Sequence, residues 1–184
     1  MQNILKNKKL VFSALAAIAC VAIAIRQFEV MSLFNIAKLA TGLVMMTLAA
    51  YTDSESKIIT NKLVLAMLGF WAAFMAVGLF LGNMQAAINA VLASLAGGLF
   101  SLVVFGITYI ASKRQLGGGD VKLATVMGLF LTSERIAGAL IYGLILCALY
   151  SGVMLFLKKL GKKDAVALAP FLAVGYFISL MFVF

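Results

Sequence analysis

The chain has 184 residues, 65% of them hydrophobic, and its 15 Lys and Arg and 6 Asp and Glu give a net charge of +9. This composition is too apolar for a soluble domain, because six or seven membrane spans of about 20 residues each would occupy most of the length. The absence of histidine excludes Ser-His and Cys-His hydrolase sites and His-ligated zinc. The two cysteines, Cys20 and Cys147, form no C-x-x-C pair, which is typical of buried small residues.

Charged and glycine-rich breaks divide the apolar sequence into seven predicted spans. In chain order these are residues 10–25, 30–52, 63–82, 86–111, 119–133, 136–157 and 165–184. The first span follows three lysines and is short, so by itself it resembles a signal peptide, but we expect it to be retained as a signal anchor. We predict an all-α polytopic membrane protein with an N-terminal anchor helix and loop over 1–34 and a six-helix membrane core over 35–184.

Basic residues fall unequally on the two sides of the membrane that seven crossings define. One side holds 12 of them: Lys6, Lys8, Lys9, Lys57, Lys62, Lys113, Arg114, Lys122, Lys158, Lys159, Lys162 and Lys163. The other side holds Arg26, Lys38 and Arg135. The positive-inside rule therefore predicts a cytoplasmic N-terminus. Because the charge lies in short loops that flank helices, it indicates contact with a lipid bilayer and not with nucleic acid.

The six acidic residues are few enough to consider singly. They are Glu29, Asp53, Glu55, Asp120, Glu134 and Asp164. Glu29, Glu134 and Asp164 follow or precede basic residues in loops, which is typical of solvated, charge-balanced acids. Asp53 ends the second predicted span and Asp120 begins the fifth, so both lie on the predicted cytoplasmic face. An Asp costs about 2.5–3.5 kcal/mol at the centre of a membrane helix and less near its ends, so its presence there needs a reason.

Two interpretations of Asp53 and Asp120 remain open from the residue types alone. In the first they mark helix ends: Asp120 suits a helix N-terminus, and Asp53 is a loop acid beside Ser54, Ser56 and Lys57. In the second they form an aspartic dyad, in which two carboxylates share a proton and titrate as a coupled pair. One then acts as base and the other as acid on a water molecule, which hydrolyses a peptide bond without metal or histidine.

The sequence around Asp120 favours the second interpretation. Gly117, Gly118 and Gly119 precede the aspartate, and they remove side-chain bulk, allow unusual backbone angles and let an extended peptide approach. The following span is short, which places Asp120 slightly below the membrane surface. Lys122, two residues further on, is typical of a lysine that reaches the lipid head groups.

Three segments resemble the type IV prepilin peptidases, the membrane aspartic proteases that trim pilin leaders. Residues 117–123, G-G-G-D-V-K-L, resemble that family's G-x-G-D-x-K-L signature. Residues 53–61 resemble its D-x(5)-I-P-N stretch, with Asn61 in register and Thr60 in place of the proline. Residues 169–175 are similar to its P-F-L-A-L-G run and contain Pro170, the single proline of the chain, whereas Ala167 replaces an earlier proline. The resemblance covers about residues 35–184.

This resemblance implies that Asp53 and Asp120 are the catalytic pair. Gly117, Gly118, Gly119, Lys122, Asn61 and Pro170 would bind the substrate or shape the site. The implied substrate is a pilin-like precursor, cut at the cytoplasmic face of the inner membrane, where its basic leader meets its apolar helix. Larger members carry a cysteine-bearing insertion and also methylate the product. Without such loop cysteines, the chain is expected to be a short, peptidase-only form like those of Tad/Flp pili, with no metal, cofactor or S-adenosylmethionine site.

Other functions remain as alternatives. The presenilin and signal-peptide-peptidase group shares the G-x-G-D signature, but its Y-D motif is interrupted here by Thr52. A small transporter or pilus-assembly subunit could use Asp53 and Asp120 to bind protons or substrate, and changing them would then leave pilin processing intact. An inactive structural homologue is disfavoured because both aspartates are present. Gly97, Gly98, Gly138 and Gly143 are expected to let helices pack closely.

Overall fold

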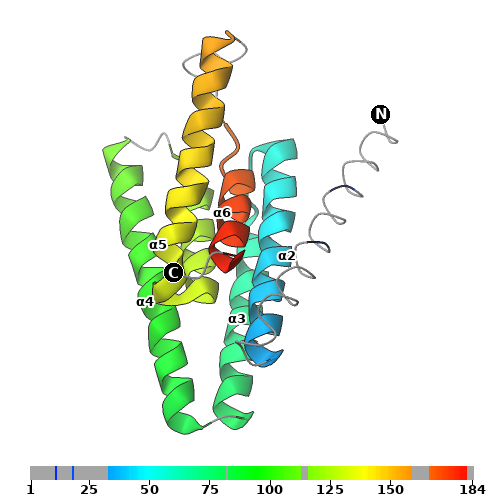
Figure 1. Cartoon of the computed structure of the whole chain (residues 1–184), viewed down its shortest axis with the longest axis vertical. Coiled ribbons are helices and arrows are strands. Elements are labelled where there is room, and N and C mark those ends of the chain that lie inside the picture. The colour runs from blue at the N-terminus through cyan, green and yellow to red at the C-terminus, as the bar shows by residue number, and fades with distance from the viewer. Residues whose placement is uncertain are drawn as a thin grey trace.

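The computed structural model describes Val11, Ile18 and residues 33–81, 83–112, 116–158 and 166–181. Within these residues it is all-helical (Figure 1). The helices are α2 (Leu33–Ser56), α3 (Asn61–Leu81), α4 (Met84–Ala111), α5 (Gly118–Phe156) and α6 (Ala169–Met181). Nearly all of the predicted first span, 10–25, and most of the predicted N-terminal part, 1–34, lie outside the described residues.

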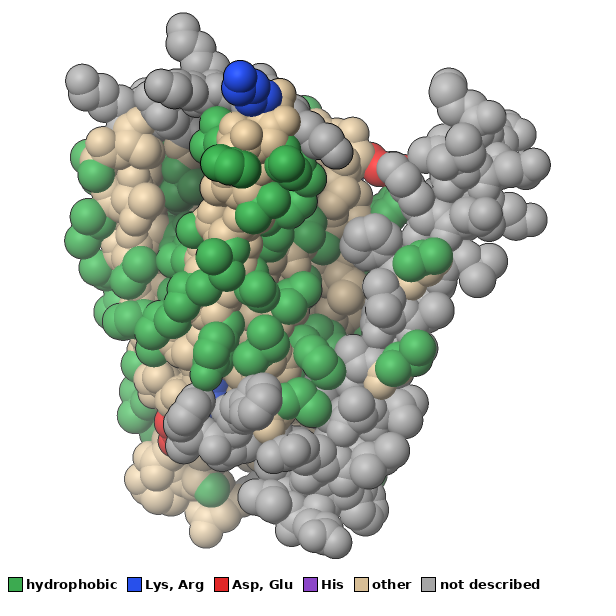
Figure 2. All heavy atoms as spheres, turned by 45° about the horizontal axis from the view of Figure 1, so that its top comes forward, with side chains coloured by type: hydrophobic (Ala, Val, Ile, Leu, Met, Phe, Trp, Pro, Cys, Tyr) green, Lys and Arg blue, Asp and Glu red, His purple; other side chains and the backbone are tan. Residues whose placement is uncertain are grey.

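Four of these helices, α2 to α5, are long and apolar enough to cross a membrane. A helix needs about 20 apolar residues to cross the hydrocarbon layer, and these helices have 21 to 39. Among the described side chains on the face shown in Figure 2, hydrophobic ones predominate, as expected for a surface that contacts lipid tails. The arrangement agrees with the predicted polytopic membrane protein.

Helix α5 contains a sharp bend that separates two of the predicted spans. Thr132 has φ 66° and ψ 175°, and helical geometry resumes after it. A β-branched residue rarely adopts a positive φ, so the surrounding packing must hold this conformation. The first arm, residues 118–131, rises about 21 Å at 1.5 Å per residue, which is less than the roughly 30 Å of the hydrocarbon layer. The end of this arm therefore lies inside the bundle.

Glycines bring the helices together at two crossings. A Cβ atom at Gly97 of α4 would lie 2.5 Å from the Gly128 carbonyl oxygen of α5. A Cβ at Gly143 of α5 would lie 3.0 Å from the Phe171 carbonyl oxygen of α6. The prediction of close packing is confirmed at these positions and at Gly98, where a Cβ would meet the Leu129 side chain. It is wrong for Gly138, whose nearest neighbour is Tyr142 of the same helix.

Helix α6 lies between α2 and the second arm of α5 in the centre of the bundle (Figure 1). Its Tyr176 is completely buried and donates a hydrogen bond of 3.0 Å to the Leu39 carbonyl oxygen of α2. This bond holds the second half of α6 beside the first part of α2, and a hydrogen bond from the Ala169 N–H to Asp53 holds the start of α6 beside the end of α2. Because the chain reverses direction at each turn, the end of α2 and the starts of α3, α5 and α6 lie at one end of the bundle. Both aspartates belong to this end.

Candidate active site

Asp53 belongs to the last turn of α2 and is buried, with 5% of its surface exposed. Its Oδ2 atom accepts a hydrogen bond of 3.0 Å from the backbone N–H of Ala169, the first residue of α6. The negative end of the α2 dipole is unfavourable for a carboxylate, but the positive end of α6 offsets it. The interpretation of Asp53 as a loop acid is therefore wrong, because α2 continues to Ser56 and ends at Lys57, which has φ 52°.

Asp120 is half-buried and is the third residue of α5. Its backbone N–H donates to the Gly117 carbonyl oxygen at 3.0 Å, and its carboxylate accepts a hydrogen bond from the Gly117 backbone. Gly117 itself is the N-cap of α5 and has no side chain to cap the helix. Asp120 thus accepts the free N–H of the N-cap residue Gly117 from inside the first turn, as the acid of a capping box does. It is not itself the N-cap residue.

The fold brings the two aspartates close enough to interact electrostatically, although 66 residues separate them in the sequence. One comes from the end of α2 and the other from the start of α5. Each also receives a backbone N–H at the beginning of a helix. Two acids in one partly buried place are the arrangement that lets one carboxyl group act as base and the other as acid.

The three glycines before Asp120 differ in what surrounds them. A Cβ at Gly117 would lie 2.9 Å from Asp120 Oδ2, and one at Gly119 would lie 3.0 Å from the Cβ of Ile59. Gly118 has open space around it. None of the described glycines has a positive φ, so the expectation of unusual backbone angles is wrong here. At Gly117 and Gly119 it is the missing Cβ that matters, since it leaves room for the Asp120 carboxylate and for the loop before α3.

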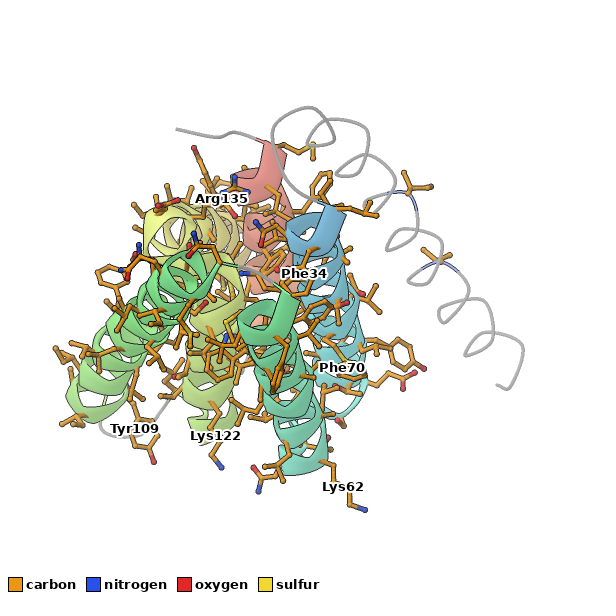
Figure 3. All side chains as sticks on the ribbon, turned by 90° about the horizontal axis from the view of Figure 1, so that it is seen from below. Phe34, Lys62, Phe70, Tyr109, Lys122 and Arg135 are labelled. Carbon is orange, nitrogen blue, oxygen red and sulfur yellow. The ribbon has the colours of Figure 1, made fainter. Side chains whose placement is uncertain are left out.

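Lys122 and Asn61, two of the predicted site residues, contact one another. The Lys122 ammonium donates a hydrogen bond of 2.9 Å to Asn61 Oδ1, which joins the first arm of α5 to the start of α3. In Figure 3, Lys122 projects between the end of α3 that carries Lys62 and the end of α4 that carries Tyr109. Lys122 is therefore held by a protein partner, in addition to being exposed enough to reach lipid head groups.

Pro170 follows Ala169, the residue whose N–H binds Asp53, and lies in the wall of a cavity of about 370 Å³. The cavity is also lined by Ser54 and Lys57 from the end of α2 and by Tyr150 from the second arm of α5. Its lining is partly polar, unlike the surrounding bundle surface. A peptide segment placed in it would contact Ser54, the residue that follows Asp53.

Sequence reasoning missed several neighbours of the pair. Ala169 lies in the motif noted around Pro170, yet nothing in the sequence indicates that its N–H binds Asp53. Ile59 lies within the second motif, whose spacing does not indicate that it packs against Gly119. Cys147 is partly buried and interacts electrostatically with Asp120, so it lies nearer the site than an isolated core cysteine would. Among the described residues, no group of three or more acidic or cysteine side chains is placed to bind a metal ion.

Comparisons with known proteins agree with the motifs. The prepilin leader peptidase/N-methyltransferase of Bacillus subtilis (strain 168) is 26% identical to the chain over 138 residues, which are 75% of this chain and 52% of that protein. The chain thus spans about half the length of this curated relative. No solved structure matches the chain. The family described as type IV leader peptidases matches residues 40–152, a range that includes both aspartates and more than half of the chain. The chain belongs to the type IV leader peptidase family.

Proposed function

We propose that this protein is an aspartic endopeptidase of the cytoplasmic membrane that removes the basic leader from pilin-like precursors. The observation that carries the proposal is the convergence of Asp53 and Asp120, from separate helix ends, at one end of an apolar helical bundle. Family membership supports leader removal as the reaction. From the name of the Bacillus subtilis relative, we extend only the peptidase activity to this chain.

In the proposed reaction, the two carboxyl groups hold a water molecule and share one proton. The unprotonated member takes a proton from the water as the oxygen attacks the scissile carbonyl, and the protonated member donates to the developing oxyanion. The proton taken from the water then passes to the leaving amine as the C–N bond breaks. A hydroxyl of the tetrahedral intermediate returns a proton to the pair as the product carboxyl group forms, so the pair is again singly protonated. Ala169 and Gly117 position the acids through their backbone hydrogen bonds.

Several features support a cytoplasmic position for this site. Lys57, Lys62, Lys122 and Lys158 lie near helix ends at the same end of the bundle as the aspartates, whereas Lys38 and Arg135 lie towards the other. This distribution follows the positive-inside rule if the aspartates face the cytoplasm. We propose seven spans, counting the first from residues 10–25 and the two arms of α5 separately, with a cytoplasmic N-terminus.

The central test is co-expression of the protein with a pilin-like precursor from the same genome. We expect Asp53→Asn and Asp120→Asn to reduce leader removal by about 10²–10⁴-fold, the usual contribution of acid–base catalysis. Asn keeps an oxygen that can accept the N–H of Ala169 or Gly117, so helix capping is retained while the proton transfer is lost. The measurement is the ratio of full-length to processed precursor, at equal amounts of enzyme in the membrane.

Glu55→Gln is the matched control, because Glu55 is an exposed acid two residues from Asp53 and bonds to Tyr51 of its own helix. It is expected to process the precursor at the wild-type rate. Normal processing by either Asp→Asn variant would disprove the dyad while leaving a peptidase of another mechanism. Failure of the wild type with every pilin-like precursor of that genome would contradict leader peptidase activity itself.

A further inference from the structure

A second cavity, distinct from the one beside Asp53, opens on the side of the bundle between α3, α4 and the first arm of α5. Its volume is about 440 Å³, and six of its nine lining residues are valine or leucine. Two of these, Leu65 of α3 and Leu102 of α4, are 66% and 44% exposed. In a membrane protein, exposed apolar side chains at the rim of a groove face lipid tails or another apolar helix.

One end of this groove lies at the first turn of α5, the turn that also carries Asp120. Val121 and Lys122, which follow Asp120 directly, belong to its lining, and so does Asn61, the hydrogen-bond partner of Lys122. Lys122 and Asn61 lie at the starts of α5 and α3, and Val64, Leu68 and Val126 line the groove further along these helices. An apolar segment bound there would have one end at the first turn of α5, the turn that carries Asp120.

The groove and the cavity lined by Pro170 differ in chemistry. The groove is almost wholly apolar, whereas the cavity contains Ser54, Lys57 and Tyr150. A substrate that is apolar on one side of the cleaved bond and polar on the other would fit both at once. Charge favours one direction: the N-terminus of a helix carries a partial positive charge, which is attracted to the acidic pair.

We propose that the groove between α3 and α4 binds the apolar helix that follows the cleaved bond of the precursor, entering sideways from the lipid. The N-terminal end of this helix lies beside Asp120, and the polar segment before the bond crosses the pair towards the Ser54 and Lys57 cavity. This inference rests on the proposed function. It adds the place where the precursor helix binds and the direction in which it runs. The occupant is a single apolar helix of the precursor and not a lipid chain or a second copy of the enzyme.

Cysteine cross-linking tests the position of the substrate. In an Asp53→Asn background that traps uncut precursor, with Cys20 and Cys147 changed to Ser, Leu65→Cys and Leu102→Cys are each paired with single cysteines along the apolar helix of the precursor. We expect cross-links from both positions to the first two turns after the cleavage site. Leu99→Cys is the control, because Leu99 is 62% exposed on the same helix as Leu102 but does not line the groove.

Equal cross-linking from Leu99, or none from Leu65 and Leu102, would overturn the proposed binding site. Cross-links to the far end of the precursor helix would overturn its direction. Processing of the same precursor by the wild-type enzyme is measured in parallel, so a misplaced groove is distinguished from an enzyme that does not cut this substrate. Cross-links between two copies of the enzyme would assign the groove to self-association.

A kinetic test does not depend on trapping. Leu102→Trp fills the groove, and we expect it to slow precursor processing at least about tenfold through a raised KM, because a lost apolar contact of 1–3 kcal/mol corresponds to 10- to 200-fold. Leu99→Trp adds the same bulk outside the groove and should process at the wild-type rate. Equal rates for the two variants, at equal thermal stability in detergent, would contradict binding in the groove.

Discussion

At the residue scale, each aspartate accepts a backbone N–H at the start of a helix. Asp120 lies in the first turn of α5, and Asp53, which belongs to the last turn of α2, accepts the first N–H of α6. Helix N-termini stabilise negative charge, so the fold offers each carboxylate a favourable partner without a metal ion or a histidine. The hydrogen bonds from helix N-termini explain why the acids are tolerated near the membrane. The proximity of the two carboxyl groups is what allows acid–base chemistry.

Gly117 offers a test of how precisely the Asp120 carboxylate must be placed. In Gly117→Ala the new Cβ would lie 2.9 Å from Asp120 Oδ2, so the carboxylate must move. We expect a loss of processing of roughly 10- to 100-fold, since displacements near 1 Å in an active site cost up to about 10²-fold. Thermal stability should stay close to that of the wild type, because the displaced group is the end of a side chain.

Gly152→Ala serves as the control for this prediction, since Gly152 is also in α5 but has open space around it. Both variants are compared for precursor processing and for unfolding temperature in detergent. A Gly117→Ala enzyme that cuts as fast as Gly152→Ala would show that the position of the carboxylate is less restricted than the geometry indicates.

At the scale of elements, the crossing of α4 with α5 determines where the bend of α5 lies. Gly97 packs against the backbone of both Gly128 and Thr132, so the close approach of α4 occurs where α5 changes direction. Ser101 adds a hydrogen bond within α4 to the Gly97 carbonyl at 3.1 Å. The first arm of α5, which carries Asp120 in its first turn, is thus fixed from its far end by contacts with α4.

Enlarging Gly97 should therefore disturb the bundle. Gly97→Ala places a Cβ against backbone atoms that cannot rotate away, and overpacking of this kind typically costs about 1–3 kcal/mol. We expect a lower unfolding temperature in detergent together with reduced processing, because the first arm of α5 also positions Asp120.

Gly106→Ala is the matched comparison in the same helix, because nothing lies within 4 Å of the added atom. Alanine is a better helix former than glycine by up to about 1 kcal/mol, so this variant is expected to be at least as stable as the wild type. If Gly97→Ala unfolds at the same temperature as Gly106→Ala, the α4–α5 crossing is not as tight as described.

At the scale of the whole molecule, charge and helix direction together set the orientation in the membrane. The aspartate end carries the ends of α2 and α5 and the starts of α3 and α6, and the turn between α3 and α4 lies at the opposite end (Figure 1). The proposed orientation places the first end in the cytoplasm. Met84, at the start of α4 and 65% exposed, would then face the outside.

Labelling with a membrane-impermeant thiol reagent tests this orientation. In a protein with Cys20 and Cys147 changed to Ser, Glu55→Cys should react only when the cytoplasmic face is accessible, as in inverted vesicles. Met84→Cys should react in intact cells whose outer barrier has been opened. Labelling in the opposite sense would invert the topology and with it the cytoplasmic position of the active site.

Hydropathy and the motifs were sufficient to predict the helices α2 to α5 and to single out two aspartates as candidate site residues. Apolar runs broken by Gly117 to Gly119 and by Glu134 and Arg135 indicated where helices begin and end, because the cost of burying polar groups in lipid acts locally along the chain. The predicted spans 30–52, 63–82 and 86–111 correspond to α2, α3 and α4, and 119–133 and 136–157 to the two arms of α5. The three motifs were sufficient to indicate the family.

The contacts between helices that are far apart in the sequence are visible only in the tertiary structure. The hydrogen bond between Asp53 and Ala169 joins residues 116 positions apart, and the one between Lys122 and Asn61 joins residues 61 apart. Nothing in hydropathy or motif spacing encodes such pairs, because they depend on which helix faces which neighbour. The bend at Thr132 and the groove between α3 and α4 likewise result from the close packing of whole helices. Such packing depends on several segments at once, so it cannot be predicted from any one of them.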